Sequence, residues 1–245
     1  MKIRLTHVII GILTLVSSNV FHVAKAGVID SESVLLDEAG ATLLEGWLGK
    51  GDLDWDSIWY GTTGATTADW HSSVDGVANT VSIYSVTYLD VVYLVGGYNA
   101  KAWDDFSNNI YANGEIDENF LFNLTTNKYF KTESPQEGCE DFQTVHRFDY
   151  FANFGCGTDL SGGSYVLGNP DGNYEAFYSS GGGGSYLEDG NILDGLANPS
   201  GGAVVISLET FTFSTARPIP EPSILALISL GLLGLFSLNR RKLQK

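Results

Sequence analysis

Residues 81–98 read VSIYSVTYLDVVYLVGGY. Both halves of this stretch are rich in β-branched and aromatic residues, which favour strands, and the first half alternates in the manner of a strand. Leu89 and Asp90 stand between the halves and have the length of a tight turn. The stretch therefore predicts a β-hairpin and, with it, an antiparallel sheet.

Most of the chain outside this hairpin is also typical of strands separated by turns. Glycine-rich turns are expected at residues 161–163 and 181–184. The further strand-like runs are Phe120–Asn123, Lys128–Lys131, Thr144–Phe151, Tyr174–Tyr178 and Ala203–Phe213.

Two helices are expected near the start of the domain. The first begins at Ser33 and ends at Gly49 to Gly51, and the second begins at Thr66 or Thr67. The apolar face of the first helix is formed by Leu36, Ala39, Leu43, Leu44, Trp47 and Leu48. The fold class predicted from these elements is mostly β: an antiparallel two-sheet β-sandwich with two short helices near its start.

The first 26 residues have the order of a secretory signal peptide with an apolar helix. Lys2 and Arg4 precede an apolar run over residues 8–16, and Ala24 and Ala26 supply the small residues of a cleavage site. A permanent anchor is the alternative, but the run is shorter than the ~20 apolar residues that cross a bilayer. We expect cleavage after Ala26.

Residues 218–245 combine a rigid break, an apolar stretch and a cationic stop. Pro220-Glu221-Pro222 precedes the uncharged residues 223–239, and Arg240 and Arg241 follow. An ordinary tail anchor would contain similar parts, but their order resembles the PEP-CTERM sorting signal of exosortase substrates. The resemblance implies a transmembrane helix over 223–239 that inserts transiently, cleavage by an exosortase-type protease, and a Gram-negative host that makes exopolysaccharide.

The part between the two ends is strongly acidic. Residues 27–222 hold six basic side chains and all 29 acidic ones, a formal net charge of −23. Such a charge repels phosphate, so no nucleic acid is expected as a partner, and anionic membrane surfaces are poor partners too. Calcium, cationic surfaces and simple solubility stay open as reasons for the charge. The length is that of one domain.

The two cysteines, Cys139 and Cys156, both lie in the part expected to be exported. An oxidising compartment favours a disulfide, but the Cα separation that a disulfide needs is not encoded in the spacing. A bond and two free thiols therefore stay equally open. A reactive thiol needs nearby positive charge, and Arg147 is the sole basic side chain between the two cysteines. This pattern argues against a redox centre.

A series of motifs over residues 33–215, in a fixed order, resembles the TLDc domain of eukaryotic oxidation-resistance proteins. The resemblance implies the β-sandwich and a role linked to protection against oxidative damage. Two departures weaken any activity that depends on charged groups: Thr62-Thr63-Gly64 replaces the usual Arg-Asp-Gly, and Thr158 stands where His is common. The motifs are Leu43–Gly49 with Trp59–Gly61, Trp70-His71, Val95–Tyr98 with Trp103, Asn119–Leu124, Phe154–Leu160, Gly184–Tyr186 with Leu193–Gly195, and Leu208–Phe211.

No recognisable catalytic set accompanies these motifs. His71 and His146 lack the spacing of zinc ligands, and neither a nucleophile elbow nor a phosphate loop occurs. Neighbouring carboxylates, such as Asp104 and Asp105 or Glu137 with Glu140 and Asp141, are most simply a solvated acidic face. Nothing in the sequence fixes the separation between two carboxyl groups that glycoside hydrolysis needs. The turn at Asn169, Asp171 and Asn173 is a weak calcium candidate. We therefore expect no enzyme and no cofactor, with calcium as the one open possibility.

Three residues are candidates for a functional role within the resemblance: His71, Glu209 and Asp159. We interpret His71 as a packed residue whose ring bonds a nearby carbonyl. For Glu209 the simplest interpretation is an outward-facing strand residue.

The predicted organisation is a signal peptide (1–26), a TLDc-like domain (33–215) and a sorting tail (218–245). The predicted function is a non-enzymatic interaction or structural module at the cell surface or in the extracellular matrix. Its expected partners are the exosortase and either exopolysaccharide or a surface protein. Two alternatives stay open: a redox protein that acts through Cys139 and Cys156, and a calcium-assisted adhesion protein.

Overall fold

The computed structural model describes residues 27–104, 110–112, 119–131, 143–155, 160–168, 192–193 and 203–216. They belong to a single compact unit, residues 26–216. Both predicted ends of the chain, with their apolar helices, lie outside the described residues, as does the strand predicted at Tyr174–Tyr178. Within the described ranges, no helix has the length and apolar character needed to cross a membrane.

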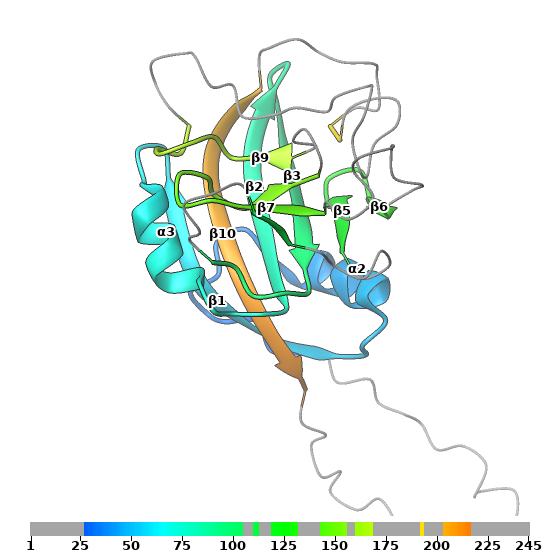
Figure 1. Ribbon diagram of the computed structural model, residues 1–245. Coiled ribbons are helices and arrows are strands. Elements are labelled where there is room, and N and C mark those ends of the chain that lie inside the picture. Colours follow the sequence, from blue (N-terminus) through cyan, green and yellow to red (C-terminus); the bar gives the residue numbers. More distant parts are fainter. Residues whose placement is uncertain are drawn as a thin grey trace, which may run out of the picture. The chain divides into compact units, whose positions relative to one another are not determined.

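The described residues form a mostly β fold, with two antiparallel sheets and two short helices (Figure 1). The last strand of the larger sheet, β10, lies between β1 and β2. In order across the larger sheet, the strands are β1 (Leu53–Thr62), β10 (Val204–Thr215), β2 (Thr80–Tyr88), β3 (Val91–Asn99), β5 (Phe120–Asn123) and β6 (Lys128–Lys131). The smaller sheet contains β4 (Ile110–Ala112), β7 (Thr144–His146), β8 (Asn153–Phe154) and β9 (Leu160–Ser161).

The hairpin predicted from residues 81–98 is confirmed as β2 and β3. Its pairing runs from Thr80 opposite Asn99 to Tyr88 opposite Val91. Leu89 and Asp90 close it with φ of 48° and 62°. Positive φ at both central residues defines the turn whose twist matches that of the two strands.

The larger sheet is covered on both faces, so its alternating side chains enter two separate cores. Tyr84 and Val86 of β2 face the smaller sheet and pack with Phe154 and Leu160. The intervening residues, such as Ile83, pack on the opposite face beneath helix α2. Every residue of β2 except Thr87 is consequently buried.

Helix α2 (Glu38–Leu48) begins later than the expected start at Ser33. The Asp37 side chain accepts a hydrogen bond from the Gly40 amide at 2.8 Å and caps the helix, and Gly49 ends it with φ of 66°. Ala39, expected on the apolar face, is exposed, whereas Leu44 is fully buried. The four residues before Asp37 form a loop instead.

Two glycines of β3 lie against close neighbours: Gly97 faces Phe154 of the smaller sheet, and Gly96 faces Ser82 and Phe122 of the larger sheet. A Cβ atom at Gly97 would lie 2.5 Å from the ring of Phe154, and one at Gly96 would lie 2.0 Å from the carbonyl oxygen of Ser82. Neither position has room for a side chain. The Gly-Gly pair of the hairpin is thus required by packing.

Two further expectations are settled around helix α3 (Thr67–Val74). The short helix is confirmed, and Thr66 caps it by accepting from the Asp69 amide at 3.2 Å. The strand expected over Thr144–Phe151 stops at His146, because the chain turns there and the Tyr150 amide bonds the Arg147 carbonyl at 3.0 Å.

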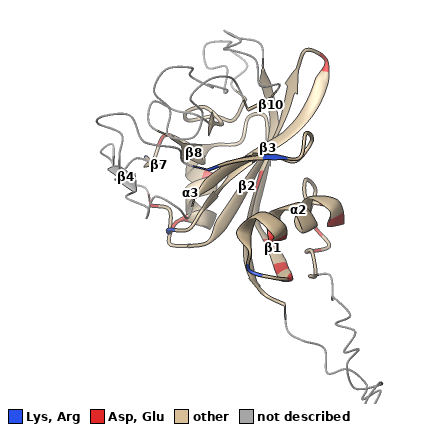
Figure 2. Ribbon diagram, turned by 90° about the vertical axis from the view of Figure 1, so that its right-hand side faces the viewer, with Lys and Arg blue, Asp and Glu red and all other residues tan. Residues whose placement is uncertain are grey.

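Figure 2 marks the charged positions along the described part of the backbone. Acidic positions lie on α2, on β1 and at the tip of the β2–β3 hairpin. The acidic composition of the sequence is thus seen on several elements of the fold.

Candidate functional site

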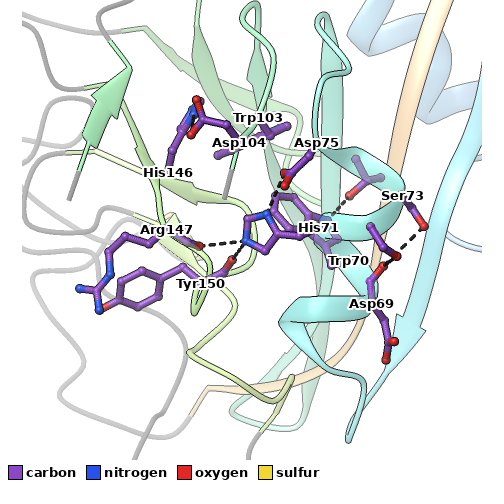
Figure 3. Close-up of polar contacts among 12 residues, drawn as sticks. Asp69, Trp70, His71, Ser73, Asp75, Trp103, Asp104, His146, Arg147 and Tyr150 are labelled. Carbon is purple, nitrogen blue, oxygen red and sulfur yellow. Dashed lines mark hydrogen bonds and ion pairs between the residues drawn. The ribbon is translucent and has the colours of Figure 1, made fainter. Parts of the chain in front are cut away.

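Helix α3 places His71 against the turn that follows β7 (Figure 3). The imidazole is 6% exposed. Its Nδ1 lies 2.7 Å from a carboxylate oxygen of Asp75, one helical turn on, and its Nε2 lies 2.9 Å and 3.0 Å from the carbonyl oxygens of Arg147 and Tyr150. All of these partners are acceptors, so a ring that carries a proton on both nitrogens donates to each of them.

These bonds connect α3 to the turn at residues 147–150. The two carbonyl groups belong to the first and last residues of that turn, so His71 links both ends of the turn to α3. The interpretation of His71 as a packed residue that bonds a carbonyl is confirmed, with a carboxylate as an additional partner. The ring has its hydrogen-bonding positions occupied by the protein itself.

His146 lies beyond a pair of tryptophans from His71. The Trp70 and Trp103 rings lie 5.3 Å apart, and Trp103 lies 4.7 Å from the His146 ring. His146 is 2% exposed, and its Nδ1 is 3.4 Å from Asp104. Burial lowers the pKa of His146, against the opposing effect of the Asp104 charge. Sequence reasoning did not single out this pair as a contact.

Glu209 of β10 is the residue for which the sequence interpretation was wrong. The side chain is fully buried, not outward-facing. Its carboxylate accepts from the amides of Val34 and Leu35 at 3.0 Å and 2.7 Å, and from the Ser57 hydroxyl at 2.6 Å. Because β10 is an inner strand with both faces covered, this carboxylate is not open to solvent. Its hydrogen bonds hold the loop that leads into α2.

The other candidates lie outside the described residues. These are Asp159, the cysteines Cys139 and Cys156, and the calcium candidate at residues 169–173. In the described ranges, no three His, Cys, Asp or Glu side chains gather closely enough to hold a metal ion.

Two exposed aromatic residues close to this site were missed by the sequence reasoning. Phe148 is 44% exposed and Tyr165 is 58% exposed, and their ring centroids lie 6.2 Å apart. Phe148 was assigned to the strand expected over Thr144–Phe151. Tyr165 follows Gly162-Gly163-Ser164, a run typical of a turn, and an aromatic residue in that place was the available signal.

Comparison with protein-family models identifies a motif in the C-terminal tail. The PEP-CTERM protein-sorting motif matches residues 218–242. The chain carries a PEP-CTERM sorting signal. The signal indicates an exported protein of Gram-negative type that exosortase processes, and it confirms the prediction made from Pro220-Glu221-Pro222 and the arginines at 240 and 241. A search of curated proteins finds no match for the chain.

Proposed function

We propose that this protein is an exported, non-catalytic interaction module with a TLDc-like domain. In this proposal the signal peptide (1–26) is removed on export, and the tail inserts through residues 223–239. Exosortase then cuts near Pro220 to Pro222, and residues 33–215 act at the cell surface or in the extracellular matrix. The PEP-CTERM match supports export and exosortase processing.

The non-catalytic part of the proposal rests on one observation: the candidate side chains His71 and Glu209 are already hydrogen-bonded to other groups of the protein. A general acid or base must come within hydrogen-bonding reach of its substrate. His71 bonds a carboxylate and two carbonyl groups, and Glu209 bonds two amides and a hydroxyl. Both side chains hold loops in place, and both are nearly inaccessible to solvent.

The TLDc-like part is supported by the roles that several motif residues have in packing. The Gly-Gly pair of β3 receives the Phe154 ring and the Phe122 ring of β5. Trp70 and Trp103 are fully buried, and their indole nitrogens donate to Thr210 and Thr80 at 3.0 Å and 2.8 Å. Motifs that resemble a family are expected at such positions when they determine its core.

Two measurements test the proposal. The intact mass of the protein recovered from its host is expected to show a C-terminus near Pro222, and a full-length C-terminus would contradict processing. A variant with Arg240→Ala and Arg241→Ala is expected to keep its tail. Independently, the purified protein is expected to leave glycan, peptide and peroxide substrates unchanged, so turnover of any of them would refute a non-catalytic role.

The link between the TLDc family and oxidation resistance is tested separately. A strain that lacks the protein would become more sensitive to peroxide if the link extends to this chain. A strain with Cys139→Ser and Cys156→Ser then decides whether thiols are responsible. If sensitivity is unchanged in both strains, the oxidative-stress role is excluded and the interaction module stands without it.

A further inference from the structure

Two adjacent turns each carry an exposed aromatic side chain at the tip. Phe148 is the second residue of the β-turn Arg147–Tyr150, which is closed by a 3.0 Å hydrogen bond between its end residues. Tyr165 is the centre of a three-residue turn, in which the Val166 amide donates to the Ser164 carbonyl at 2.7 Å. Turn tips ordinarily carry glycine or small polar residues, so aromatic residues at both tips need a reason.

The turn at Tyr165 is strained. Its φ is 61°, and a three-residue turn with positive φ at its centre is the rarer and less stable form. A bulky side chain in this region of backbone space is a true outlier, because its Cβ crowds the following peptide. The side chain is 58% exposed, so burial does not compensate for the strain. Strain of this kind is found where a residue must be presented in one orientation.

The two turns are fixed to each other and to α3. The Tyr165 amide donates to the Asp149 carbonyl at 2.8 Å, and the Tyr165 carbonyl accepts from the Thr67 amide at 3.0 Å. His71 holds the other turn through the carbonyl groups at its two ends. The backbone positions of Phe148 and Tyr165 are therefore fixed relative to each other and to α3, so the two side chains leave the fold from a preorganised pair of turns.

The two rings form an open corner, and a cationic residue belongs to the same turn as Phe148. Their planes are inclined at 72°. Arg147 directly precedes Phe148 in the same turn, and its guanidinium pairs with Asp149 through contacts of 2.7 Å and 2.5 Å and lies 4.6 Å above the Tyr150 ring. The pairing with Asp149 engages Nε and Nη2, and a guanidinium has five N–H groups, so Arg147 retains donors for another molecule.

We propose that Phe148 and Tyr165 form a binding site for a neutral hexose polysaccharide. One aromatic face stacks on the C–H face of a pyranose ring, the second ring contacts its edge, and Arg147 donates to its hydroxyl groups. A sugar ring offers this combination of one apolar face and a polar rim. This inference rests on the proposed function, because it supplies the interaction module with a ligand class.

The size and charge of the surroundings favour a sugar over the other occupants. A stable protein interface buries about 800 Å² on each partner, which exceeds what two side chains provide. An anionic membrane or an anionic polysaccharide would meet a domain with a formal charge of −23 over residues 27–222, which opposes its approach. A neutral polymer avoids this repulsion and repeats the small contact along its length.

The test measures binding of the purified full chain to neutral polysaccharides. Dextran, laminarin and galactomannan serve as probes in affinity electrophoresis, with alginate as the anionic comparison. We expect retardation by at least one neutral polymer, a loss of affinity of tenfold or more in Phe148→Ala, and unchanged affinity in Tyr60→Ala. Tyr60 is the matched control, since it is a 42% exposed tyrosine on β1.

Tyr165→Gly separates binding from folding. Glycine adopts positive φ without strain, so this variant is expected to be at least as stable as the parent protein while its affinity falls tenfold or more. Loss of stability in Tyr165→Gly would refute the strain argument.

Three results would overturn the inference. Either no neutral probe is bound, or all variants bind the probes equally. The third is that Phe148 and Tyr165 bind vesicles or proteins instead of sugars. In each case the proposed interaction module still stands. Hydrolysis of a bound polysaccharide would instead refute the proposed function.

Discussion

Replacement of Glu209 gives the most direct test of how the N-terminal loop is held. In Glu209→Ala, the amides of Val34 and Leu35 lose their acceptor, and the Ser57 hydroxyl loses its partner. A buried donor left without a partner costs about 1–3 kcal/mol. Two such amides therefore cost about 2–6 kcal/mol, and since the Val34 side chain is 57% exposed, water can reach part of this loop. We expect a loss of about 2–4 kcal/mol.

Glu209→Gln is the matched control, because it keeps the shape and one acceptor oxygen. Its amide group can donate to Ser57, whose hydroxyl can also accept. The change removes mainly the strengthening that a charge gives to these hydrogen bonds, so we expect a loss of about 1 kcal/mol. The free energy of unfolding is measured for each variant by urea denaturation at constant pH.

A double-mutant cycle with Ser57→Ala isolates the contact to the hydroxyl. We expect Ser57→Ala to cost about 1 kcal/mol alone and less when Glu209 is already alanine, because the two side chains share one bond. If Glu209→Ala leaves the unfolding free energy unchanged, or if Gln and Ala are equally damaging, the reasoning about an acceptor for two amides is refuted.

Further predictions concern the glycine contact, the pH dependence and the hairpin turn. Gly97→Ala is expected to cost about 1–3 kcal/mol in urea denaturation, because its Cβ would meet the Phe154 ring, whereas Gly46→Ala in exposed helix, with no atom within 4 Å, should gain up to about 1 kcal/mol. Burial lowers the pKa of His146, so the fold favours the neutral imidazole. The stability linked to this residue is therefore full above the unfolded-state pKa of ~6.5, and it is lost as the pH falls toward the lower folded-state pKa. Thermal unfolding between pH 5 and 7.5 should show a shallower slope in His146→Gln, and an unchanged slope would contradict the assignment. The double change Leu89→Asn with Asp90→Gly should raise the unfolding free energy by about 1 kcal/mol, because both positions have positive φ; a loss would show that another turn geometry is preferred.

The local elements were predictable from sequence where neighbouring residues decide them. The hairpin at residues 80–99 follows from two strand-forming runs at the spacing of a two-residue turn. Helix α3 follows from the capping threonine at its start. Both features depend on hydrogen bonds between residues close in the chain, so a single window of sequence contains the information.

The errors arise where distant parts of the chain meet. Glu209 was assigned an outward direction because its strand was treated alone, but β10 lies between β1 and β2 and α2 covers that face. Helix α2 begins at Glu38 instead of Ser33, since the preceding loop bonds Glu209. The strand after Thr144 ends early because His71 of α3 holds the following turn. None of these partners is near in sequence.

The place of β10 in the sheet also sets the order of events during export. A chain that crosses the membrane from its N-terminus delivers β1 first, but β1 has no neighbour in the larger sheet until residues 204–215 arrive. Contacts this distant in sequence form slowly and late. The sorting signal at residues 218–242 follows directly after that strand. Any chain that presents the signal to the exosortase has therefore already delivered the strand that completes its sheet, and a chain that ends before residue 204 lacks both.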